Sequence, residues 1–98
     1  MNRPVIVRPE AKQDVQEIRD YLKQQREGAA AKFDSRLVAV LTSIAAMPFL
    51  HGKVWRKVRA VRVGGFRYVV YYVVFRDRID VIAVMHGARR AAAWMSRA

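Results

Sequence analysis

The side chains that could do chemistry lie mostly in the second half of the chain, where a histidine and several arginines interrupt apolar runs. The last of these runs ends in VMHGARR, so Arg89 and Arg90 follow closely after His86. Histidine can give or take a proton near neutral pH, and arginine stabilises negative charge on a phosphate. If the chain is an enzyme, His86 and Arg89 are therefore its candidate catalytic residues.

Further cations and one tyrosine in this half could contact the phosphates of a target or an acidic partner. Arg59 and Arg62 lie in one predicted strand at positions of opposite parity, so they point to opposite faces and at most one of them lines a given site. Structural alternatives stay open, because a histidine at a strand end is often only hydrogen-bonded and tyrosines at strand spacing often belong to the core. The candidates for target or phosphate binding are Lys57, Arg59, Arg62, Arg67, Tyr72 and Arg90.

The positive charge of the chain is concentrated in the same half. The formal net charge is +11, from 19 Lys and Arg against 8 Asp and Glu in 98 residues. Eleven of these cations and two of the acids fall in residues 53–98, which leaves eight and six for residues 1–52. A surface with such a localised charge attracts negative partners. The sequence therefore predicts a nucleic acid or an acidic protein as partner.

Composition narrows the class of protein further. The chain has no cysteine, which excludes disulfides and thiolate metal sites and suits a reducing cytoplasm. The longest apolar run, residues 68–75, is far shorter than the roughly 18 residues needed to span a bilayer. We expect a cytoplasmic protein with a single domain over residues 1–98.

The first half predicts a strand and a helical hairpin. The β-branched run at residues 5–7 predicts a short strand, and Pro9 suits the first position of a helix. Apolar residues then recur at helical spacing on either side of the polar stretch QQREG, which contains Gly28, until Pro48 ends the pattern. The two predicted helical stripes are Ala11, Val15, Ile18 and Leu22, and Ala30, Phe33, Leu37, Val40, Leu41 and Ile44.

The second half predicts a three-stranded antiparallel meander. Strands are expected over residues 58–63, 66–75 and 79–85, with turns at Gly64–Gly65 and at residues 76–78. Residues 88–97 are expected to form a short C-terminal helix or tail. The fold class is therefore α+β. Because the helices can cover only one face of the sheet, we expect the other face to bind a partner.

This order of elements, with three motifs, resembles the RelE/ParE superfamily of toxins from type II toxin-antitoxin systems. The motifs are AKQDVQEIRDYL at residues 11–22, VRVGGFRYVVYYVV at residues 61–74 and VMHGARRAAAW at residues 84–94. The resemblance implies a small prokaryotic toxin that works without a metal or organic cofactor. It also implies a hetero-oligomer with a cognate antitoxin, whose acidic and partly disordered segment wraps the toxin and blocks it.

The superfamily contains ribosome-dependent messenger RNA endonucleases and toxins that inhibit DNA gyrase. Endonuclease members typically place a tyrosine or an acid and base near the C-terminus, and no tyrosine follows Tyr72 here. The ending HGARR is more similar to the ParE side, so binding to DNA gyrase is our first hypothesis. Cleavage of messenger RNA on the ribosome, with His86 as its proton donor or acceptor, is the alternative. A third hypothesis from another class is a non-toxic basic module that only binds nucleic acid.

Overall fold

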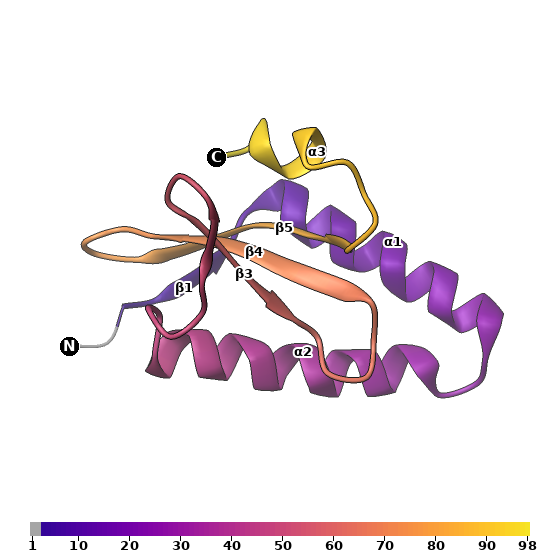
Figure 1. The fold of residues 1–98 in the computed structure, drawn as a ribbon. Coiled ribbons are helices and arrows are strands. Elements are labelled where there is room, and N and C mark those ends of the chain that lie inside the picture. Colours follow the sequence, from indigo (N-terminus) through magenta and orange to yellow (C-terminus); the bar gives the residue numbers. More distant parts are fainter. Residues whose placement is uncertain (1–2) are drawn as a thin grey trace.

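The chain forms a strand, two long helices, four further strands and a short helix (Figure 1). The computed structural model describes residues 3–98. The bounds of the elements are β1 (Val5–Val7), α1 (Pro9–Gln25), α2 (Ala29–Ala46), β2 (Lys53–Trp55), β3 (Val58–Arg62), β4 (Tyr68–Val74), β5 (Ile79–His86) and α3 (Ala92–Met95). The predicted N-terminal strand, helical hairpin and α+β class are confirmed.

The five strands form one sheet in the order β1-β5-β4-β3-β2. β3, β4 and β5 pair antiparallel, which confirms the predicted meander. β1 pairs parallel with β5, with Val5 opposite Ile79. The edge strand β2 was not predicted, because its three residues are too few to show an alternating pattern. The sheet is therefore mixed, with β4 at its centre.

The turn between β3 and β4 is longer than the sequence predicts. Gly65 adopts a positive φ of 78°, as expected for a glycine turn. β4 begins only at Tyr68, whereas the prediction placed its start at Phe66. The Phe66 ring instead packs edge-to-face against Phe33 of α2, with 5.6 Å between centroids. Packing against the helix thus takes Phe66 out of the strand.

The helical hairpin covers one face of the sheet. Pro9 begins α1, and Gly28 adopts a φ of 80° between the helices, where the chain reverses. The apolar stripes of both helices are largely buried, as predicted, and pack against the alternate side chains of β4 that face them. The centre of this core contains Ile18, Phe33, Ile44, Val70, Tyr72 and Val81.

The opposite face of the sheet is partly covered by the chain itself, which corrects the prediction that it is open to a partner. Figure 1 shows α3 on the side of the sheet away from α2. The Trp94 ring of α3 stacks on Tyr71 of β4, with 4.5 Å between centroids and 14° between planes. Trp94 is buried in a second apolar cluster with Val58, Val73, Ile82 and Met85. The four-residue helix α3 therefore acts as a cover for the second face.

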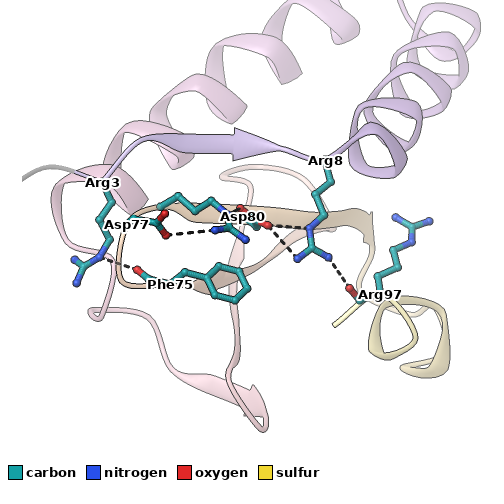
Figure 2. A network of polar contacts seen from close by, with 7 residues as sticks. Arg3, Arg8, Phe75, Asp77, Asp80 and Arg97 are labelled. Carbon is teal, nitrogen blue, oxygen red and sulfur yellow. Dashed lines mark hydrogen bonds and ion pairs between the residues drawn. The ribbon is translucent and has the colours of Figure 1, made fainter.

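A network of charged side chains joins both ends of the chain to β5 (Figure 2). The Arg8 guanidinium donates to Asp80 Oδ2 at 3.0 Å and to the carbonyl of Arg97 at 2.7 Å. Arg78 also pairs with Asp80, which is buried. These bonds give Asp80 a structural role.

No helix within residues 3–98 combines the length and the apolar character needed to cross a membrane.

Candidate functional site

The predicted site residues lie at two different ends of the sheet. In the antiparallel pairing, Arg62 lies opposite Val69 and Tyr68 lies opposite His86. This brings the end of β3, the start of β4 and the end of β5 together. Lys57, which precedes β3, lies at the other end of that strand. We call Arg62, Arg67, His86 and Arg89 the His86 end.

A shallow hollow of about 490 Å³ opens between two of the arginines and the histidine. Arg62, Arg67 and His86 line it together with Gly87 and Ala88, and none of its described lining residues is acidic. The Gly87 N–H donates to the carbonyl of Arg67 at 2.8 Å, which ties the end of β5 to the β3–β4 turn. Two guanidinium groups without a nearby acid favour the binding of a negatively charged group.

His86 is exposed at the end of β5, and its ring is already partly engaged. Its Nδ1 accepts a hydrogen bond from the Ala88 N–H at 3.0 Å, so the neutral ring carries its proton on Nε2. The ring stands edge-to-face against Tyr68, with 6.0 Å between centroids. The histidine is therefore held in one orientation, with Nε2 as the nitrogen available for a ligand or a proton transfer.

A second hollow, of about 180 Å³, lies on the helix side of His86. Arg89 and His86 line it beside Tyr68 and two residues of α1, Glu17 and Tyr21. Burial raises the pKa of Tyr68, with a smaller contribution from the charge of Tyr21, so the Tyr68 hydroxyl stays protonated at neutral pH. This hollow contains a hydroxyl, an imidazole, a guanidinium and a carboxylate.

Sequence reasoning missed Glu17 and Tyr21 as members of this site. Both belong to the polar face of α1 and are separated by one helical turn, so their pattern is that of an ordinary solvated surface. They approach His86 only because α1 packs across β5. No signal local to the sequence could have placed them beside the end of a strand so far along the chain.

Tyr72 is fully buried, which corrects the prediction that it contacts a target. Its hydroxyl donates to the carbonyl of Pro48 at 2.8 Å, and its ring meets His51 edge-to-face. Burial raises the pKa of Tyr72, and the positive charge of Arg59 opposes this in part. Tyr72 therefore anchors the segment that follows α2 to the sheet.

The remaining predicted cations are not part of the His86 end. Arg59 lies on the helix face of the sheet, where Nη1 donates to the carbonyl of His51 at 2.7 Å. Arg62, which does belong to the His86 end, lies on the other face, as the strand alternation predicts. Lys57 is exposed beside the β2–β3 turn, and Arg90 is exposed in the turn before α3. The eight predicted residues therefore do not form one site.

The His86 end can bind an anionic group through its arginines, and it also contains an imidazole that could transfer a proton. His86 is the one imidazole that lines either hollow among the described residues. Within residues 3–98, no group of His, Asp and Glu side chains could hold a metal ion.

Comparison with known protein families identifies the family of this chain. The model of the family described as the ParE toxin of the type II toxin-antitoxin system parDE matches residues 5–91. The matched segment runs from β1 to the turn after β5, so it contains every predicted site residue and ends just before α3. No curated protein matches the chain.

Proposed function

Because the chain belongs to the ParE toxin family of type II toxin-antitoxin systems, we propose that it arrests bacterial growth by binding DNA gyrase. Membership of this family also means that its expected partner is a cognate antitoxin. We propose that this antitoxin is acidic and that both proteins act in the cytoplasm. The observation that carries the proposal is the family match across nearly the whole chain.

The arrangement at the His86 end supports a binding mechanism. Arg62 and Arg67 bring two positive charges to one hollow, and none of the described residues that line it is acidic. Binding of a protein target requires such a surface and no catalytic group. The Nδ1 of His86 is occupied by a backbone N–H of its own turn, which is the kind of contact that a structural histidine makes.

The alternative function, cleavage of messenger RNA on the ribosome, is favoured by one specific observation. His86 lies between the two hollows, with Arg62 and Arg67 on one side and Arg89 and Tyr68 on the other. Its Nε2 could protonate the leaving oxygen of RNA while the arginines stabilise the phosphate. In this second reading His86 is the catalytic residue and Arg89 assists it.

One experiment distinguishes these functions. The chain is expressed from an inducible promoter in bacteria, and plasmid supercoiling and messenger RNA integrity are followed through the first minutes of growth arrest. We expect supercoiling to be lost while messenger RNA stays intact. Cleaved messenger RNA with normal supercoiling would instead support the endonuclease function. If growth does not slow at all, this chain is not an active toxin.

A matched pair of double variants tests the His86 end in purified form. Arg62→Ala with Arg67→Ala should weaken inhibition of gyrase by about tenfold or more, because each removes a charge from the same hollow. Arg26→Ala with Arg76→Ala removes the same charge from exposed positions elsewhere and should have little effect. Equal inhibition by both double variants would exclude the His86 end as the surface that binds gyrase.

A further inference from the structure

The segment after α2 and the edge strand β2 expose four large apolar side chains. The exposed fractions are 56% for Met47, 57% for Phe49, 62% for Leu50 and 52% for Val54. Single exposed apolar residues are ordinary, but a local group of them marks a surface for contact with another molecule. We call these four residues the Phe49 patch.

The Phe49 patch is held in place rather than left loose. Tyr72 donates to the carbonyl of Pro48 at 2.8 Å, and Arg59 donates to the carbonyls of His51 and Phe49 at 2.7 and 3.4 Å. The Leu50 N–H closes a turn onto the carbonyl of Met47 at 3.1 Å. A surface that is already ordered loses less conformational entropy when a partner binds.

Several cations lie beside the Phe49 ring of the patch. The guanidinium groups of Arg3 and Arg59 lie 5.3 and 5.2 Å from the centre of the Phe49 ring. A hollow beside this ring is lined by Lys53, Lys57 and Arg59, and none of its described lining residues is acidic. The patch therefore combines exposed apolar side chains with positive charge on the side of Phe49.

We infer that the Phe49 patch binds an acidic segment of the antitoxin that carries apolar side chains. Charge complementarity selects this partner, since carboxylates meet the cations while apolar side chains cover Leu50 and Val54. A second copy of this chain carries the same +11 charge and would be repelled. A nucleic acid would neutralise the cations but would leave the apolar side chains exposed to water. The inference rests on the proposed toxin function only in naming the antitoxin as the partner.

The test compares two substitutions at equally exposed apolar residues. Leu50 and Val38 are each 62% exposed, and Val38 lies on α2 outside the patch. The probe is the cognate antitoxin in purified form, titrated into the protein of residues 1–98 by calorimetry. Leu50→Asp should weaken binding by about tenfold or more, because it removes apolar contact and repels carboxylates. Val38→Asp should change the affinity by less than about twofold.

A second pair keeps the test decisive if Leu50→Asp does not fold. Lys53→Glu in the patch should weaken binding and reduce its dependence on salt, whereas Lys12→Glu on α1 should do neither. Equal affinities within both pairs would overturn the inference while leaving the toxin function intact. Absence of binding between the wild-type chain and that antitoxin would instead contradict the proposed partner.

Discussion

Arg97 binds Asp14 through two hydrogen bonds, from Nη1 to Oδ2 at 2.6 Å and from Nη2 to Oδ1 at 3.2 Å. The same Oδ2 accepts the Val84 N–H at 3.0 Å, and Arg97 Nη1 donates to the Ile82 carbonyl at 3.1 Å. β1 pairs with β5 only at residues 79–81, so the rest of this edge has no strand beside it. The Asp14–Arg97 pair therefore takes the place of a strand and satisfies the backbone groups of the edge.

Asp14→Ala should destabilise the fold by about 2 to 4 kcal/mol, because it leaves the Val84 N–H without its acceptor and the Arg97 guanidinium without its counter-ion. The midpoint of urea unfolding measures the change. Asp34→Ala is the control, since it breaks the more exposed pair with Arg19 and should shift the midpoint far less. Equal shifts would mean that the edge contact contributes no more than a surface pair.

Trp94→Ala should cost about 3 to 5 kcal/mol, because the indole is buried against Tyr71 and covers the second face of the sheet. Thermal unfolding measures the loss, and binding of a hydrophobic dye should rise as that face becomes accessible. Trp94→Phe keeps an aromatic ring and should cost clearly less. If removal of the ring left stability and dye binding unchanged, α3 would not be the cover of this face.

Stability should decrease as pH rises above about 10, because the folded state keeps Tyr68 and Tyr72 protonated while the unfolded chain loses these protons. Burial raises both pKa values. The stability that these two protonated tyrosines contribute is therefore complete at a pH below their pKa in the unfolded chain, and it is lost as pH rises through their pKa in the folded protein. The difference in proton binding therefore favours the unfolded state at alkaline pH.

Tyr72→Phe isolates one of these groups. At neutral pH it should cost about 1 kcal/mol through loss of the bond to Pro48. The stability gap between wild type and variant should then narrow as pH rises from about 8 to about 11, since only the wild type has this hydroxyl to titrate. Urea unfolding at several pH values measures the gap, and a gap that does not change would contradict the link to Tyr72.

Gly28→Ala should destabilise the chain by about 1 kcal/mol, because a φ of 80° is unfavourable for a residue with a Cβ atom. The added methyl group would meet no atom within 4 Å, so only backbone conformation is tested. Gly52→Ala is the matched control: that site is equally open and lacks a positive φ, so the substitution should be neutral or slightly stabilising. Chemical unfolding of both variants gives the comparison.

His86→Ala separates the two mechanisms of toxicity. If the chain binds gyrase, inhibition in a supercoiling assay should fall by no more than a few fold, because the ring contributes contact and no chemistry. If it cleaves messenger RNA, the cleavage rate should fall by about 100-fold or more with loss of the proton donor. A large loss of gyrase inhibition with a normally folded variant would make His86 a central contact of the binding surface.

Much of the fold follows from local sequence, and the reasons are visible in particular residues. Pro9 marks the start of the helical hairpin and Gly28 marks the turn between its two helices, and the apolar spacing of each helix predicts the face that it buries. Gly64–Gly65 and residues 76–78 mark the turns of the meander, which is antiparallel because short turns connect its strands. The family likeness rested on this same order of elements, and the match over residues 5–91 confirms it.

The composition of the site was decided by tertiary structure. Strand alternation correctly separated Arg59 from Arg62, but it could not tell which face of β4 meets the helices, since both faces are apolar. Packing of α1 and α2 selected the face that contains Tyr72, which buried a residue predicted to bind a target. Glu17 and Tyr21 line the same hollow as His86 for the same reason, although they are far from it in the sequence and no local pattern connects them.

The sequence by itself determined the class of protein, the order of its elements and the concentration of charge in its second half, because these depend on neighbouring residues and on composition. Tertiary structure alone decided that Arg62, Arg67 and Arg89 belong to the His86 end while Lys57 and Arg59 lie beside the Phe49 patch, and that α3 covers the second face. These outcomes depend on strand register and on helix-to-sheet packing, in which residues far apart in the chain compete for the same buried space.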